Sequence, residues 1–295
     1  MKKHTLWMTI PVTTAVLLAL AGCGGTNSNQ TSAAGSTPPA AAGDSTQAEK
    51  GNTAASDSGD SGASGSTETA GSNSNGSNSH PELSDVNDVV KSVRSELKMS
   101  GAVLPTSFPL PKDRYLGAVI TTNTSDAFLV NFYKASKPAG LNDPSLTKSN
   151  SKVPWLASYE VKTYSNPNQT DIFPETNLDN FPEDMTVDLG HGIKGMVEGA
   201  AGSQYLTWQE GRWTMQIRSV SEDQMNNPGI AKKMVDYLET HMLSAPKDKG
   251  YVNVEYASGG KTVRVTISWQ DGKQIHQLKT EQVPLDALQM VVSVK

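Results

Sequence analysis

The amphipathic pattern of this chain begins only near residue 81, where a helical stripe starts. Apolar residues recur there at helical spacing, at Val86, Val89, Val90, Val93 and Leu97. Asp85 and Asp88 stand at the start of the stripe and Lys98 at its end, which suits the dipole of a helix. The pattern therefore predicts a helix over residues 84–98.

Strand patterns of period two follow this helix. Residues 115–122 and 127–134 flank four polar residues, which predicts a hairpin. Residues 156–164 predict a third strand, after a loop rich in Pro and Asn. A shorter strand is expected at residues 185–189, before a glycine-rich turn.

A further hairpin is expected around a two-residue Glu210-Gly211 loop. This register places Trp208 opposite Trp213, and it places Leu206 opposite Met215 on the same face. Cross-strand aromatic pairs stabilise a sheet by roughly 0.2–1 kcal/mol. We therefore interpret the two tryptophans as structural residues rather than as a surface that stacks sugar rings.

Asn227 and Pro228 predict the start of a second helix, with Asn as N-cap and Pro in the first position. Its apolar stripe comprises Ile230, Met234, Tyr237, Leu238, His241 and Met242. The helix is expected to end near Ser244, before Pro246. This places His241 beside the core, and we interpret it as a partly buried structural histidine rather than a catalytic one.

Three strands in a meander are expected next. The first turn, at residues 259–260, pairs Tyr256 with Val263, Val254 with Val265 and Val252 with Ile267. The second turn, Asp271-Gly272, is the strongest short hairpin signal in the chain. It places Ile267 opposite His276 but leaves Ile275 on the outer face, for which a bulge or a one-residue shift of the register is the alternative.

The chain is expected to close with a strand at residues 288–294, the alternative being a helical turn at 285–290. Together these elements predict an α+β fold, with an antiparallel sheet built from hairpins and two main helices. The folded module spans residues 81–295, and a sub-boundary is allowed near residues 246–250.

The first residues follow a different pattern. Lys2 and Lys3 precede a mostly apolar stretch that runs to Ala21, which is the layout of a secretory signal. Polar residues and Pro11 interrupt this stretch, so it falls short of the roughly 20 apolar residues of a membrane-spanning helix. We expect a lipoprotein signal peptide over residues 1–22.

The signal closes with Leu20-Ala21-Gly22-Cys23, which resembles the lipobox of bacterial lipoproteins. The resemblance implies cleavage between Gly22 and Cys23 and attachment of acyl chains such as palmitate to Cys23. Two or more acyl chains anchor a protein stably. The expected location is therefore the outer face of the plasma membrane; the alternatives are an ordinary cleaved signal and an uncleaved anchor.

Residues 24–80 are almost entirely Ser, Gly, Thr, Ala and Asn, and contain no large apolar residue. Such a segment cannot bury enough apolar surface to offset the entropy of ordering, so Cys23 and residues 24–80 predict a disordered tether. Its r.m.s. span as a flexible coil is about 40 Å. A tether of this length suits the thick wall of a Gram-positive envelope.

Composition and charge exclude several classes of protein. The chain has 25 basic and 30 acidic residues, for a net charge of −5, and it therefore lacks the basic surface of a nucleic-acid binder. Its one cysteine excludes internal disulfides and cysteine-rich zinc sites. We expect no nucleic-acid partner, no metal and no cofactor.

The sequence contains few candidate catalytic or ligand-binding residues. Residues 190–195 match G-x-G-x-x-G literally, but they do not open a helix after a strand, so a flexible turn is expected instead of a dinucleotide site. His191 within this turn is the most plausible reactive histidine, with Asp188 close in sequence. No serine occupies a nucleophile elbow, and Cys23 is expected to be lipidated.

An acidic stretch comprises Asp171, Glu175, Asp179, Glu183, Asp184 and Asp188. It lacks the regular spacing of a calcium loop, so we interpret it as a solvated loop. A pair of carboxylates that acts as in a glycosidase remains an alternative, although the spacing of the acids singles out no pair. We therefore assign no catalytic, metal or cofactor residue.

As a whole, residues 84–295 resemble an uncharacterised group of lipoproteins from spore-forming Gram-positive bacteria. Three pieces carry the resemblance: the first helix with Leu104-Pro105-Thr106, the hairpin at 206–211 with its following helix, and residues 287–295. The resemblance implies an extracytoplasmic location and this architecture, and it supplies no catalytic residues.

Three functions fit these observations. The first is a non-enzymatic envelope lipoprotein whose tethered module binds an envelope protein, a wall polymer or a small ligand. The second is a hydrolase of wall glycan or peptide that uses His191 and the acids of 171–188. The third is a solute-binding lipoprotein, which usually requires two α/β lobes.

Overall fold

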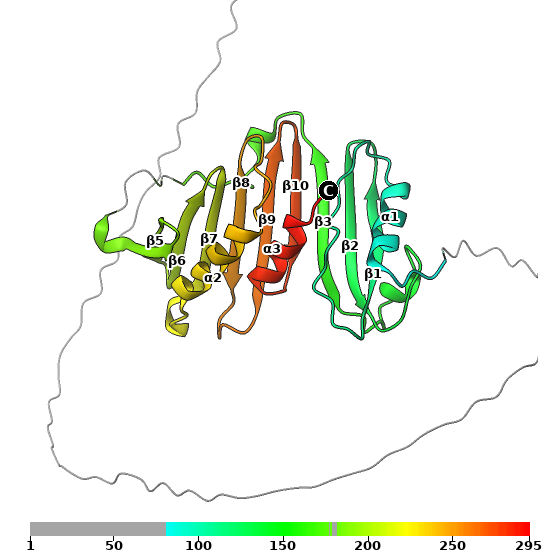
Figure 1. Ribbon diagram of the computed structural model, residues 1–295, viewed down its shortest axis with the longest axis horizontal. Helices are drawn as coiled ribbons and strands as arrows, with labels where there is room; N and C mark the ends of the chain where they lie inside the picture. Colours follow the sequence, from blue (N-terminus) through cyan, green and yellow to red (C-terminus); the bar gives the residue numbers. More distant parts are fainter. Residues whose placement is uncertain (1–80, 177, 179–181) are drawn as a thin grey trace, which may run out of the picture. The chain divides into compact units, whose positions relative to one another are not determined.

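A single ten-stranded sheet organises the part of the chain that the structure, a computed structural model, describes: residues 81–176, 178 and 182–295. The expected signal, lipobox and tether lie outside these residues. Figure 1 shows the strands side by side, in the order β1-β2-β3-β10-β9-β8-β7-β6-β5-β4. The strands are β1 (Tyr115–Asn123), β2 (Ala127–Ala135), β3 (Trp155–Thr163), β4 (Thr186–Gly190), β5 (Ile193–Ala200), β6 (Ser203–Glu210), β7 (Trp213–Val220), β8 (Gly250–Tyr256), β9 (Val263–Asp271) and β10 (Gln274–Thr280).

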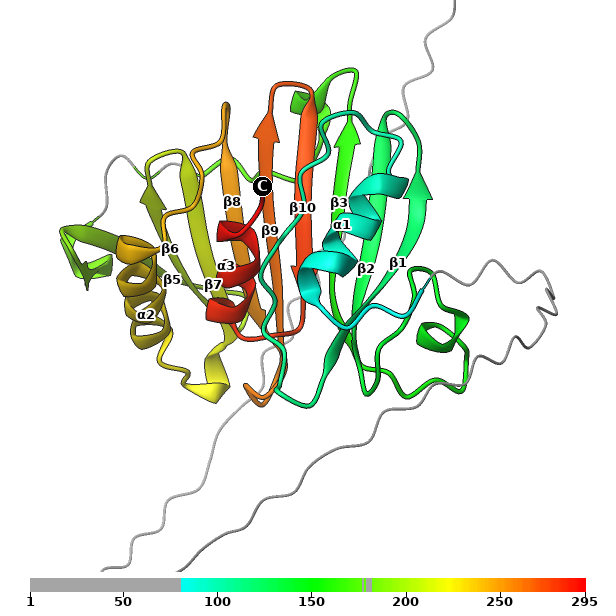
Figure 2. The same ribbon diagram turned by 45° about the vertical axis from the view of Figure 1, so that its right-hand side comes forward.

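Three helices cover one face of this sheet, as both ribbon views show (Figures 1 and 2). They are α1 (Val86–Glu96), α2 (Asn227–Thr240) and α3 (Pro284–Val292). The core lies between the helices and the sheet, where alternate strand residues such as Met215, Ile217, Val265 and Ile267 are fully buried. The α+β class is thus confirmed in its coarse form, with a third helix beyond the two expected.

The sheet is mixed rather than wholly antiparallel. Every neighbouring pair of strands is antiparallel except β7 and β8, which run parallel. Parallel strands cannot be joined by a tight hairpin and need a crossover connection. Here α2 lies within that crossover, between Val220 and Gly250.

An aspartate caps the first of the two expected helices, and an asparagine caps the second. Asp85 is the N-cap of α1 and accepts a hydrogen bond from the backbone N–H of Asn87 at 2.7 Å. In α2 the N-cap is Asn226, which accepts from Gly229 N at 2.9 Å. Asn227 is instead buried, and its Nδ2 donates to Ser219 Oγ. The prediction of Asn227 as N-cap was wrong by one residue.

The end of α2 lies earlier than expected, at Thr240. His241 leaves the helical conformation, with φ −133° and ψ 68°, and its exposed ring stacks on Tyr237 at 4.4 Å between centroids. Met242 follows with 80% of its surface exposed. The prediction that His241 lies partly buried beside the core was therefore wrong, because the helix stops before this position turns inward.

The sequence predicted three strand registers, of which the structure confirms one and corrects two. Strands β8 and β9 pair as expected from residues 259–260, with Val254 opposite Val265. In the other two hairpins the register is displaced by two residues. Trp208 lies opposite Met215 instead of Trp213, and Ile267 lies opposite Leu278 instead of His276.

Both displacements have the same cause. The two-residue loops are Gly211-Arg212 and Gly272-Lys273, so glycine takes the first loop position with φ 59° and 66°. Hairpin turns with a positive φ at that position favour glycine there, and the preceding acid therefore remains in the strand. A displacement of two residues keeps every side chain on its expected face, and Ile275 is 3% exposed.

The closing segment is helical, so the strand predicted at residues 288–294 was wrong. Pro284 occupies the first turn of α3, where its missing N–H costs nothing. The buried residues of this helix are Pro284, Ala287, Leu288, Met290 and Val291. They recur at helical spacing, which a short apolar run does not distinguish from a buried strand. Within the described residues, no helix combines the length and the apolarity that crossing a bilayer requires.

Replacement of Gly272 tests the role of the turn glycine. Gly272→Ala should lower the free energy of unfolding by about 1–2 kcal/mol, because a Cβ disfavours its positive φ. No atom lies within 4 Å of the added Cβ, so the cost is conformational. Urea denaturation measures it. Gly199→Ala is the matched control, since Gly199 has equal space and no positive φ; an equal loss in both variants would contradict this account.

Candidate functional site

The lipidation residues expected from the sequence, Leu20, Ala21, Gly22 and Cys23, lie outside the described residues. His191 is described, and it occupies the two-residue turn between β4 and β5. His191 and Gly192 both have positive φ values, 53° and 77°, as a tight hairpin turn of two left-handed residues requires. The literal glycine motif is therefore a strand-to-strand turn, as expected.

The acids that contact His191 come from α2 and not from residues 171–188. Asp236 Oδ1 lies 3.0 Å from His191 Nε2, and Glu239 Oε2 lies 3.8 Å from Nδ1. Asp188 instead accepts a hydrogen bond from Gly190 N at 2.9 Å and supports the turn, while Asp179 lies outside the described residues. Proximity in sequence suggested Asp188 as the partner of His191. The packing of α2 against β4 instead brings Asp236 and Glu239 to this histidine.

A third carboxylate, Glu210, lies at the end of β6 beside this cluster. Its Oε1 accepts a hydrogen bond from the indole N–H of the fully buried Trp208 at 2.9 Å. Burial raises the pKa of the Glu210 carboxyl, the Trp208 hydrogen bond lowers it, and the nearby charge of Glu239 raises it again. Sequence reasoning placed Glu210 in a loop and missed it as a site residue.

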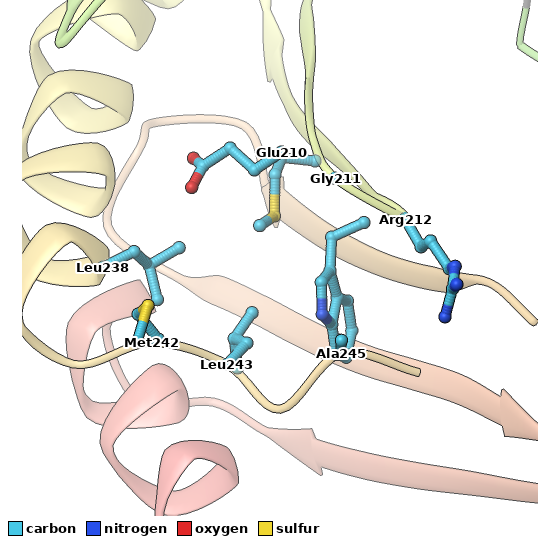
Figure 3. A pocket seen from close by; sticks show the side chains of 9 residues that line it. Glu210, Gly211, Arg212, Leu238, Met242, Leu243 and Ala245 are labelled. Carbon is cyan, nitrogen blue, oxygen red and sulfur yellow. The ribbon is translucent and has the colours of Figure 1, made fainter. Parts of the chain in front are cut away.

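Glu210 forms one wall of a cavity of about 230 Å³ between the β6–β7 turn and the end of α2. Figure 3 shows Glu210 on the side nearer the helix and Arg212 on the opposite side, with Leu238, Met242 and Leu243 below. Trp213 and Met215 complete an apolar wall. The Arg212 guanidinium donates to the carbonyl of Pro246 at 2.8 Å, so part of its hydrogen-bonding capacity is already used.

A second group of polar residues is buried beneath the helices. His276 is 5% exposed and stacks on Trp269, with 4.7 Å between ring centroids and 8° between planes. Its Nδ1 lies 2.9 Å from the hydroxyl of Tyr159, and its Nε2 lies 3.9 Å from Asp271 Oδ2. These residues come from β10, β9 and β3, and the sequence showed only that His276 belongs to a strand.

The hydrogen bond assigns the tautomer of His276. Among the described residues, Nδ1 is the only hydrogen-bond partner of the buried Tyr159 hydroxyl. A buried hydroxyl hydrogen requires an acceptor, so Tyr159 donates to Nδ1 and the ring carries its hydrogen on Nε2. Burial lowers the pKa of His276 to about 4, against the opposing effect of the Asp271 charge. Burial also raises the pKa of Tyr159 well above its usual value.

Across residues 81–176, 178 and 182–295, no three His, Cys, Asp or Glu side chains gather in a way that would hold a metal ion. The His191 cluster therefore offers hydrogen bonds and charge. No protein-family model, curated protein or solved structure matches this chain.

Burial of neutral His276 should make stability depend on pH. The folded pKa of about 4 lies below the unfolded value of 6.5, so the unfolded chain takes up a proton first as the pH falls. The stabilisation is complete above pH 6.5 and is lost on acidification toward pH 4, by about 3 kcal/mol. Urea denaturation across this range should show the loss.

His276→Gln should flatten that pH profile, since an amide does not titrate there, and its oxygen can still accept from Tyr159. His241→Gln is the matched control, because His241 is exposed. A profile that is unchanged by His276→Gln, or flattened equally by His241→Gln, would assign the pH dependence to other groups.

Proposed function

We propose that this chain is a lipid-anchored extracytoplasmic lipoprotein whose module of residues 81–295 acts as a binding module rather than an enzyme. The Leu20-Ala21-Gly22-Cys23 pattern supports the anchor, and the polar segment 24–80 supports a tether that spaces the module from the membrane. The envelope that this arrangement suits best is a Gram-positive one. The partner is an envelope protein, a wall polymer or a small ligand.

The Glu210 cavity is the binding site that the geometry supports best. Its walls are apolar except for Glu210 and Arg212, and such cavities bind ligands through shape and a few placed polar groups. Glu210 is half-buried, and burial raises the pKa of its carboxyl, against the opposing effects of the Trp208 hydrogen bond and His191. A ligand cation near Glu210 would stabilise the carboxylate.

Charge in this region favours a cationic head group. Glu239, which contacts His191, adds a negative charge near Glu210, and the Arg212 guanidinium on the opposite side donates to the carbonyl of Pro246. A charge-assisted hydrogen bond to a carboxylate contributes about 1.5–3 kcal/mol. The ligand class is therefore an apolar group that carries an ammonium, such as a lysine-like side chain of a peptide.

Substitution of Cys23 tests the anchor. In a bacterial host, Cys23→Ser should abolish incorporation of labelled palmitate and move the protein from the membrane fraction to the soluble fraction, because the thiolate is the nucleophile for lipid attachment. Thr26→Ser, just outside the lipobox, should leave both properties unchanged. Membrane retention of the Cys23→Ser protein would rule out anchoring through this residue.

Substitution of Glu210 tests the ligand site. Phenethylammonium should bind the whole chain and change tryptophan fluorescence through Trp213, and Glu210→Gln should weaken this binding at least about tenfold. Glu198→Gln, at an exposed position of β5, is the matched control. Tight binding of phenethylammonium to the Glu210→Gln protein, or stronger binding of the anionic analogue phenylpropionate, would refute the proposed site.

A hydrolase of wall glycan or peptide is the second candidate. The observation that favours it is the 3.0 Å contact between His191 and Asp236, next to a carboxyl whose pKa is raised, since paired groups of this kind perform acid–base chemistry. Purified chain incubated with envelope glycan and peptide distinguishes the two functions. Turnover that His191→Ala abolishes, without loss of folding, would replace the binding proposal.

A further inference from the structure

Two cavities other than the Glu210 cavity have His276 and Asp271 in their linings. One has a volume of about 160 Å³ and the other about 180 Å³, and Val103, Asp271 and His276 line both. The indole rings of Trp213 and Trp269 line the first, whereas Phe128, Lys247 and Gln274 line the second. Apolar side chains and a small set of polar side chains thus line the two cavities.

The polar atoms of His276 and Asp271 are complementary to a hydroxyl group. The Nε2–H of His276 is a donor, and Asp271 Oδ2, 3.9 Å away, is an acceptor. This separation is too long for a hydrogen bond. One hydroxyl oxygen can accept from Nε2–H and donate its own hydrogen to Oδ2, whereas an ammonium cannot accept and a carboxylate cannot donate.

Both groups are held in place by other contacts. Tyr159 binds the opposite nitrogen of His276, and Trp269 stacks on the ring. Asp271 Oδ1 accepts a hydrogen bond from the backbone N–H of Lys247 at 2.7 Å, so Oδ2 is the oxygen that faces His276. Little side-chain freedom is therefore lost when a ligand binds, which favours affinity.

We propose that this pair of cavities binds a neutral hydroxylated ring the size of a monosaccharide, with one hydroxyl held between His276 and Asp271. The proposal assigns a second site beyond the cationic one, and Trp213 lines a cavity of each.

Glucose is the probe for this site, and the whole chain is used. Millimolar glucose should shift the Nε2 nitrogen resonance of His276 in a long-range ¹H–¹⁵N spectrum. Asp271→Asn should reduce glucose binding at least about tenfold. The Lys247 N–H holds the amide oxygen, so the amide NH2, a donor, replaces the Oδ2 acceptor. Asp248→Asn is the matched control: Asp248 Oδ2 accepts from Gly272 N in the same turn region but does not line either cavity.

A second variant distinguishes loss of glucose binding from loss of folding. Val103 lines both cavities, and Val103→Phe enlarges the side chain there; it should abolish the glucose response while retaining the folded spectrum. Glu198→Gln, at an exposed position of β5 that lines neither cavity, should leave glucose binding unchanged. The proposal is overturned if glucose leaves the His276 resonance unmoved, or if Asp271→Asn and Asp248→Asn respond to glucose alike.

Discussion

The parallel pairing of β7 with β8 is the constraint on which both candidate sites depend. A parallel neighbour requires a crossover, and this crossover contains α2 and the segment that follows it. The helix lies against β4, β6 and β7 and brings Asp236 and Glu239 to His191. The following segment places Lys247 on Asp271, next to His276. An antiparallel β7–β8 hairpin would remove both arrangements.

Burial disfavours the charged form of a side chain at both sites, and it shifts the two pKa values in opposite directions. Glu210 is an acid at the wall of a partly apolar cavity, so burial disfavours its charged form and raises its pKa. His276 is a base under the helices, so burial again disfavours the charged form and here lowers the pKa. A ligand cation at the first site would stabilise the carboxylate, whereas the second site presents a neutral donor beside one acceptor.

Particular residues show how far sequence reasoning reached. Most strands and their inward faces followed from alternation and turn glycines, and the β8–β9 register was right for each pair considered. The β6–β7 and β9–β10 registers were wrong by two residues, because an acid before glycine was counted as part of the loop. That error preserved the faces but misplaced Trp213 and His276. His191 was correctly placed in a turn, while its partners on α2 were missed.

The sequence by itself determined which positions of each strand are apolar and where the chain turns, because these depend on residues only a few positions apart. The tertiary structure decided the parallel pairing, the helical form of residues 284–292 and the composition of the three cavities. Tyr159 and His276 are 117 residues apart in the chain. Their contact arises only when β3 and β10 pair within the sheet, and no local periodicity encodes that pairing.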